Sequence, residues 1–297
     1  MQRFKNILCV IEHGEQGIPA LERAVTLAEH NQAKLTVVDV VPPVPAVIGM
    51  PDGGPIPGHL QAAMVREHEA RILSLLEPYR QRFDFQHGVL QGTSFLEIIR
   101  AVLRNGHDLV IKCPESPSWL DRFFSGDDMH LLRKCPCPVW LVKPEASKTY
   151  RGILAAVDVH DGYPPRELET RHSLNVQILE MAASLAISES SELHVVHAWE
   201  SMTELVSAFM ISSDFSEDEI AANREQERRQ QQWLLDQFIG NLKLNSHAAR
   251  DALDYLQLST HLLQGSAPVS YTHLRAHETT ASISYAVFCL KKGGGGG

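Results

Sequence analysis

The chain has 297 residues, 44% of them hydrophobic, and a formal net charge of −9. This length is more than one compact domain usually takes and indicates two. The acidic balance leaves no broad basic surface, so we expect no direct nucleic-acid partner. The N-terminus carries no secretion signal and no apolar run reaches the roughly 20 residues of a membrane span, so we expect a cytoplasmic protein with no membrane partner.

The first 145 residues alternate between strand and helix patterns. Strands are predicted at residues 6–12, 34–41, 85–90, 108–113 and 138–143, and helices at 19–30, 58–82, 94–105 and 120–134. Ser94, with Glu97 three residues on, is predicted to cap the third helix. Short apolar strands alternating with helices indicate an α/β fold with a doubly wound, Rossmann-like parallel sheet.

The same pattern then starts again. GILAAVD at 152–158 repeats NILCVIE at 6–12, ELHVVH at 192–197 answers the second strand, and LLQGS around Gly265 echoes VLQGT around Gly92. Helices are predicted at 174–187 and from Ser216, where Glu219 completes a capping box. The apolar stripe of this second helix is predicted to include Trp233, Leu234 and Phe238. This internal repeat predicts tandem domains at 1–145 and 152–268, joined by a linker at 146–151.

The second copy stops at Pro268 without its last helices and strands, and the sequence changes character at Val269. Residues 269–297 have no periodicity and end in a glycine run. VSYTHLRAHET and ISYAVFCL within this segment resemble the translation of the two ends of a sequencing-library adapter. We therefore predict that 269–297 is a non-native tail, and we exclude it from the predicted fold and function.

The repeated strands, the QG turns, HDLVIK and above all LLRKCPCPVWLVK resemble the universal stress proteins over roughly residues 3–267. The tandem arrangement is most similar to the E-type, tandem-domain branch of that family. The resemblance implies a cytoplasmic stress protein with no catalytic residues to transfer, and hence not an enzyme. Many members bind ATP and others do not. It also implies that the two domains pair with each other through their final strands.

The first copy lacks the glycine-rich phosphate loop of the ATP-binding members. Where that loop would begin stand Pro114, Glu115 and Pro117; the prolines remove backbone donors and the carboxylate repels phosphate. Asp127 and Asp128, farther on, either cap the next helix or occupy the anion position themselves. We therefore expect no nucleotide in the first copy.

The second copy carries the remaining candidates for a ligand site. Asp158 follows the first strand of this copy, where open α/β sheets place ligand-facing groups. The family resemblance implies a base or ribose contact there and at the backbone of Ala198, and Gly265 marks the neighbouring turn. Capping of the turn by Asp158 remains an equal alternative. Glu12 is its counterpart in the first copy, where a longer side chain suits a shallower or vestigial pocket.

No metal site is predicted. Cys135-Pro-Cys137 lacks a second ligand pair at zinc spacing and stands where a strand begins, which favours a structural role. His194 and His197, three residues apart on one strand, point to opposite faces and are predicted to be sheet histidines.

The leading hypothesis is a non-catalytic tandem stress protein that binds an unknown small molecule or partner. Two alternatives remain open: ATP binding or slow ATP hydrolysis through the second copy, and a protein-interaction scaffold with no small ligand. Because the second copy lacks its final strand, the strand from Pro138 to Lys143 is predicted to be an apolar, unpaired edge. Such an edge predicts self-association, with a homodimer as one form.

Overall fold

The structure is a computed structural model. It describes residues 4–12, 14–44, 55–114, 126–143, 150–203, 216–245, 247–256, 258–265 and 287–289. The chain forms two compact units, Met1–Lys148 with Ala286–Gly297, and Thr149–Tyr285. Among the helices of the described ranges, none has the length and apolar character that crossing a membrane requires.

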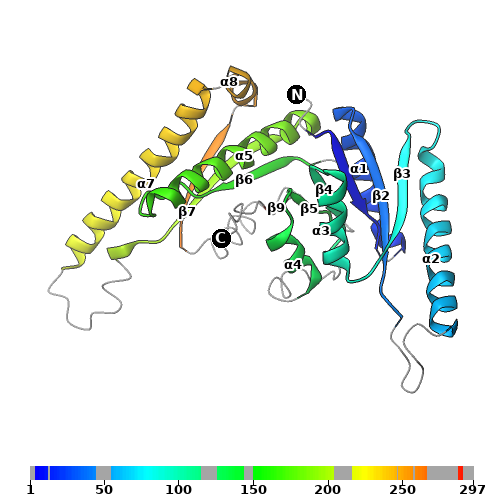
Figure 1. Ribbon diagram of the computed structural model, residues 1–297. Coiled ribbons are helices and arrows are strands. Elements are labelled where there is room, and N and C mark those ends of the chain that lie inside the picture. The colour runs from blue at the N-terminus through cyan, green and yellow to red at the C-terminus, as the bar shows by residue number, and fades with distance from the viewer. Residues whose placement is uncertain are drawn as a thin grey trace. The chain divides into compact units, whose positions relative to one another are not determined.

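The first unit is built on a parallel sheet with helices on both faces (Figure 1). Its elements are β1 (Asn6–Val10), η1 (Gly14–Gly17), α1 (Ile18–Asn31), β2 (Lys34–Val41), α2 (Pro55–Leu76), η2 (Glu77–Tyr79), β3 (Phe85–Gln91), α3 (Ser94–Asn105), β4 (Leu109–Lys112), α4 (Asp127–Lys134) and β5 (Val139–Leu141). The strand order is β3-β2-β1-β4-β5, all parallel. The predicted doubly wound α/β fold is confirmed for this unit.

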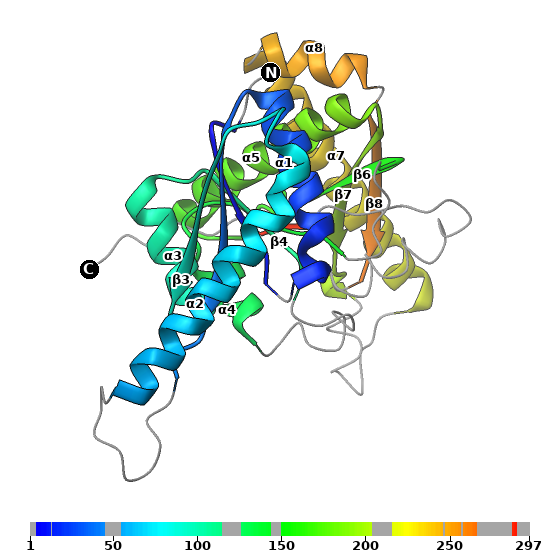
Figure 2. The same cartoon turned by 90° about the vertical axis from the view of Figure 1, so that its right-hand side faces the viewer.

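The winding of the sheet follows from right-handed crossovers. The chain moves outward from β1 to β2 and β3, and then returns to β4 and β5 on the other side of β1, so α1 and α2 lie on one face and α3 and α4 on the other (Figure 2). Alternate strand residues on the second face form one apolar core with α3 and α4. Its fully buried members include Leu8, Val10, Val38, Val110 and Val139.

Two features of the first unit differ from the sequence predictions. Ser94 does not cap α3: the N-cap residue is Thr93, without a side-chain capping bond, and the Ser94 hydroxyl instead donates to Glu12. The edge of β5 is not unpaired either, because β9 (Val287–Cys289) pairs with it in antiparallel fashion. The strand predicted as an open edge is thus covered within the chain, and self-association through it remains a prediction.

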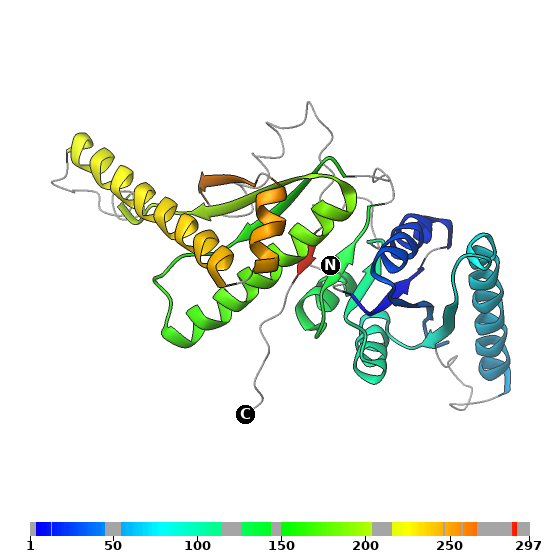
Figure 3. The same cartoon turned by 90° about the horizontal axis from the view of Figure 1, so that it is seen from above.

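The second unit repeats the first three strands (Figure 3). Its elements are β6 (Gly152–Val157), α5 (Pro165–Glu189), β7 (Glu192–Trp199), α7 (Glu217–Asn245), α8 (His247–Tyr255) and β8 (Ser259–Gln264). The strands are parallel, in the order β6-β7-β8. Gly152 pairs with Glu192 as Asn6 pairs with Lys34, so both copies use the same register.

Helix α7 tests the prediction of the long charged helix. Ser216 and Glu219 bond reciprocally, which confirms the capping box. Phe238 is buried, as predicted. Trp233 is 59% exposed, so the prediction that it belongs to the apolar stripe is wrong. The buried stripe runs instead through Gln231 and Leu235. The helical period of 3.6 residues does not fix exactly where the buried face of a helix ends, and Trp233 lies just outside the buried face of α7.

Candidate functional site

The carboxyl ends of β1 and β4 meet where the strand order of the first sheet reverses. Val10 at the end of β1 pairs with Lys112 at the end of β4, and Glu12 follows β1 by two residues. Open α/β sheets bind their ligands at such a switch point, because the loops that leave the two strands diverge and leave a crevice between them. In this protein that place holds a charged cluster.

Lys112 is the centre of the cluster. Its Nζ lies 2.7 Å from Glu12 Oε2 and 2.7 Å from Asp128 Oδ1, and its side chain is only 1% exposed. Glu12 also accepts a hydrogen bond from the Ser94 hydroxyl at the start of α3. Asp128 reaches the lysine from the first turn of α4. One buried cation thus ties the carboxyl ends of β1 and β4 to both helices of the second face.

The two carboxylates keep Lys112 charged. Burial alone lowers the pKa of a lysine, but here the charges and hydrogen bonds of Glu12 and Asp128 more than offset it, so the pKa of Lys112 lies above its ordinary value. A buried cation with both partners in place is stable, whereas one that lost a partner would be strongly disfavoured. The cluster therefore resists displacement.

Asp39, on β2, forms a second buried polar group in the first unit. It is 1% exposed, and its Oδ2 lies 2.8 Å from His68 Nδ1 and 2.5 Å from Arg71 NH2, both on α2. Arg71 passes close to Gly14 in the loop after β1. This cluster was not predicted from the sequence, although an aspartate inside the apolar run KLTVVDVV indicates a buried partner.

Asp158 occupies in the second unit the place that Glu12 has in the first. Its backbone N–H and C=O both bond the side chain of Asn175 on α5, at 3.0 and 2.6 Å. Its carboxylate accepts hydrogen bonds from the Tyr163 hydroxyl and from Arg171, whose guanidinium stacks 3.6 Å from the Tyr163 ring centroid. The Asp158 side chain is 40% exposed and that of Arg171 31%, so this group faces solvent.

The surroundings of Asp158 match the turn-capping alternative, and a ligand contact there stays a prediction. Asp158 Oδ1 accepts a hydrogen bond from His160 N at 3.3 Å, which is the turn-capping arrangement. The carboxylate is also open to solvent at the carboxyl edge of β6, as a ligand contact requires. A carboxylate has more acceptor positions than these contacts use, so capping does not prevent it from receiving a further donor.

The other predicted site residues lie at the same edge of the second sheet. Ala198, half-buried, precedes the last residue of β7, and Gly265 directly follows β8. Gly265 N donates to Trp199 O at 2.9 Å, as Gly92 N donates to Val41 O at 3.0 Å in the first copy. Both glycines have positive φ, +113° and +146°, which side chains rarely adopt.

A buried histidine adds to this edge and was not assigned to the site from the sequence. His197 is 1% exposed, with Nδ1 3.2 Å from Val157 O and Nε2 3.1 Å from Gln231 Oε1 on α7. Gln231 Nε2 in turn lies 3.5 Å from His160 Nδ1. His194, on the opposite face of β7, contacts His261 at 3.0 Å. Both are sheet histidines with partners, as predicted.

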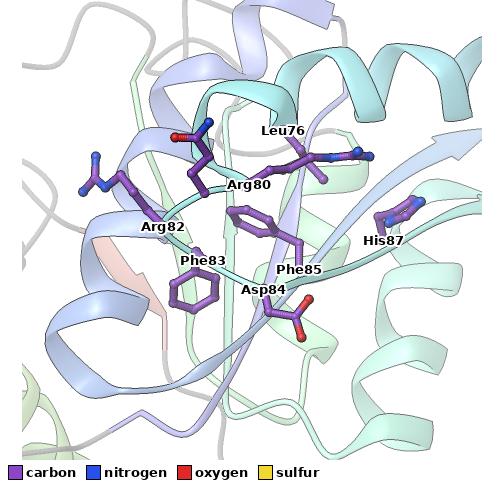
Figure 4. Close-up of a pocket in the computed structure, with 8 residues that line it drawn as sticks. Leu76, Arg80, Arg82, Phe83, Asp84, Phe85 and His87 are labelled. Carbon is purple, nitrogen blue, oxygen red and sulfur yellow. The ribbon is translucent and has the colours of Figure 1, made fainter.

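Two hollows lined by described residues lie at the opposite edge of the sheets. In the first unit, a hollow of about 530 Å³ is lined by the end of α2, the turn after it and the start of β3, with Phe83, Phe85, Arg80 and His87 around it (Figure 4). A hollow of about 570 Å³ lies at the corresponding place of the second unit, between α7, α8 and the start of β8. Neither is at the carboxyl edge, so neither coincides with a predicted site residue.

No group of three or more histidine, cysteine, aspartate or glutamate side chains with the arrangement of a metal site occurs within the described ranges. Cys135 and Cys137 form a pair of neighbouring thiols, with the sulfur atoms 3.7 Å apart.

The comparisons with known proteins agree with this architecture. Residues 3–143 match the family model described as the universal stress protein family. Curated relatives include universal stress protein E of Photorhabdus laumondii, 26% identical over 208 residues, and that of Escherichia coli K12, 28% identical over 208 residues. Each alignment covers 67% of this chain and 63% of the relative. The chain thus spans less than two thirds of the length of these relatives.

Solved structures support the fold. A universal stress protein structure from Pseudomonas aeruginosa UCBPP-PA14 matches with a TM-score of 0.61 at 22% identity, covering 98% of this chain and 94% of the other. One from Archaeoglobus fulgidus matches with a TM-score of 0.54 at 12% identity, over 92% and 84%. The first unit thus matches the universal stress protein family over residues 3–143, and the chain is similar to universal stress proteins E over two thirds of its length.

Proposed function

We propose that this protein contributes to stress tolerance by binding a ligand and not by catalysis, and that the ligand site belongs to the second copy. The observation that carries the proposal is the position of Lys112. In the first copy its ammonium group and the two carboxylates around it fill the switch point, where a member with a bound ligand would place that ligand.

A nucleotide in the first copy would have to break this cluster. Phosphate groups would meet Glu12 and Asp128, both negative, and could reach Lys112 only by displacing at least one of them. Displacement leaves a buried carboxylate without its cation, at a cost of about 3–5 kcal/mol. The prolines at 114 and 117 also remove backbone donors from the segment after β4. Both effects oppose phosphate binding.

The second copy offers the opposite arrangement. Asp158 and Arg171 are each about one third exposed or more, and together they present an acceptor and a cation at the carboxyl edge of the sheet. A small molecule with a hydroxyl or amine donor and an anionic group would suit this pair, because each group would exchange one partner for another of the same charge. In this proposal the backbone of Ala198, half-buried at the same edge of the sheet, would contact a planar ring.

ATP is one molecule of this class, and ATP binding or slow hydrolysis through the second copy is the first alternative. It is supported by the occurrence of ATP-binding members in the family that the sequence resembles. The second alternative is a scaffold without a small ligand, supported by the ion pairs that already engage both Asp158 and Arg171.

Calorimetric titration of the full chain with Mg-ATP and with AMP, up to millimolar concentration, tests the proposal. We expect Asp158→Asn to weaken any saturable binding at least tenfold and Glu12→Gln, at the equivalent position of the first copy, to leave it unchanged. Circular dichroism of both variants checks that they fold. Binding that persists in Asp158→Asn but is lost in Glu12→Gln would contradict the proposal. No saturable binding of either nucleotide would favour the scaffold.

A further inference from the structure

We propose that Cys135 and Cys137 are a modification site: a dithiol that a hydroperoxide converts into a reversible intramolecular disulfide. The proposal concerns the junction between α4 and β5 and does not depend on the ligand site of the second copy. Sequence spacing favoured a purely structural role for the two cysteines, and the geometry around them points to chemistry in addition.

The backbone brings the two sulfur atoms together. Helix α4 ends at Lys134, and Cys135 is its C-cap residue in an extended conformation, with its N–H bonded to Leu131 O at 2.8 Å. The chain then bends at Pro136 and Cys137 before β5. The sulfur atoms lie 3.7 Å apart as a result. A disulfide bond is about 2.05 Å long, so side-chain rotation has to close about 1.7 Å.

The surroundings favour reaction at this pair over the other described cysteines. Cys9, Cys113 and Cys135 are all buried, and burial raises the pKa of the Cys9 and Cys113 thiols, that of Cys113 to about 11. Cys137 is only partly buried, so a peroxide can reach the pair from its side. The hydrogen bond between the two thiols lowers the pKa of Cys135 and raises that of Cys137. The lower pKa makes Cys135 the attacking sulfur in the proposed reaction.

The reaction balances in two steps. The Cys135 thiolate attacks the terminal OH oxygen of the hydroperoxide and the O–O bond breaks, leaving a sulfenic acid on Cys135. The departing alkoxide or hydroxide takes up a proton from solvent and leaves as alcohol or water. Cys137 sulfur then attacks the Cys135 sulfur, the S–O bond breaks, and the departing hydroxide leaves as water with the Cys137 proton. Two thiols are oxidised to one disulfide and one peroxide is reduced.

Zinc chelation is less well supported by the same pair. A structural zinc site needs four ligands, and the described ranges contain no third histidine, cysteine or carboxylate placed to join the two sulfurs. A disulfide needs only these two atoms and the small movement given above. The two cysteines thus supply both atoms that a disulfide needs, but only two of the four ligands of a structural zinc site.

Peroxide treatment of the full chain, in a Cys289→Ser background that removes the thiol of the tail, tests the proposal. After limited hydrogen peroxide near neutral pH, peptide mass spectrometry should show 135 and 137 linked with the loss of two hydrogen atoms, reversed by dithiothreitol, while Cys9 and Cys113 stay free. Cys137→Ser should accumulate a sulfenic acid on Cys135 that dimedone traps. Cys135→Ser should react at least tenfold more slowly.

The outcomes separate the proposal from a structural role. Oxidation of Cys9 or Cys113 before the pair, or conversion of Cys135 and Cys137 to separate sulfinic acids without a linked peptide, would overturn it. The Cys135→Ala, Cys137→Ala double variant, compared by thermal unfolding, measures the packing contribution of the two side chains. If that variant unfolds, the linked peptide from the parent protein still decides, because its detection needs no substitution at either cysteine.

Discussion

The carboxyl edges of the two sheets have the same backbone geometry but differ in the arrangement of their charged side chains. Both copies have the same strand register, the same positive-φ glycine and the same hydrogen bond from it to the second strand. In the first copy the acidic residue after the first strand is clamped by a buried lysine from β4, and in the second it meets an exposed arginine from α5. The two copies therefore have the same strand register and turn geometry at this edge, whereas the partners of the acidic residue differ with the side chains of each copy.

A second contrast concerns the sheet face that α3 and α4 cover in the first unit. Leu8 and Val10 are fully buried there. Their equivalents, Leu154 and Ala156, remain partly exposed in the second unit, where the described ranges contain no helix after β8. Burial of this face thus depends on elements that follow the third strand, and the first three strands form their register without them.

The largest expected effect comes from removing the buried cation. Lys112→Met should lower the free energy of unfolding of the first unit by about 3–5 kcal/mol, because Glu12 and Asp128 would face each other, buried, without a counter-charge. Urea unfolding measures it. Arg228→Met is the matched control: it removes an exposed pair with Glu225 and should change the free energy by less than about 0.5 kcal/mol. Equal effects would show that the cluster is not critical.

Shortening a core side chain at equivalent positions of the two copies should show how differently the two units bury this sheet face. Leu8→Ala should cost about 2–5 kcal/mol, since the side chain is fully buried against α3 and α4. Leu154→Ala, at the same register position of the second copy, should cost about 1 kcal/mol or less, because the leucine already contacts solvent. Denaturant titrations of both variants provide the comparison. A cost at Leu154 as large as at Leu8 would mean that this face is covered after all.

The shared glycine turn should be intolerant of side chains. Gly92 has φ +146°, and a Cβ there would lie 2.8 Å from Glu97 Cγ, so Gly92→Ala should destabilise by about 1–3 kcal/mol. Gly88→Ala, in the same strand with open space around it, should fall within about 0.5 kcal/mol of the parent. Thermal unfolding at matched pH separates the two. Equal melting temperatures would remove the argument that the turn requires glycine.

Alkaline pH should weaken the first copy through Lys112. The folded-state pKa lies above the ordinary value of 10.5, so the lysine contributes stability below pH 10.5 and loses it as the pH rises through the folded value. The parent should therefore lose about 1 kcal/mol more than Lys112→Met between pH 10 and 11.5. The charge of Lys112 also lowers the pKa of the neighbouring Cys113 thiol, so both proteins carry Cys113→Ser and the difference between them isolates the lysine. Parallel pH profiles would contradict the raised pKa.

The sequence predicted the framework of the first unit well and the partners of its charges poorly. Strand and helix periodicity gave the α/β order, because burial of alternate residues is local information. The ion pair of Lys112 with Asp128 joins the end of β4 to a residue of α4 sixteen positions later, and no spacing rule shows that contact. The same reason explains Ser94: a serine before a helical run suits an N-cap, but Glu12, far away in sequence, accepts its hydroxyl.

The smallest expected effect is at the exposed pair of the second copy. Arg171→Ala removes an ion pair between side chains that are 31% and 40% exposed, so the free energy of unfolding should fall by about 1 kcal/mol or less. Part of that change comes from the lost stacking on Tyr163, which Arg171→Lys would also lose while keeping the charge. Denaturant titration of both variants separates stacking from charge. A loss as large as that of Lys112→Met would mean that the pair is structural, and the open acceptor on which the ligand proposal rests would not exist.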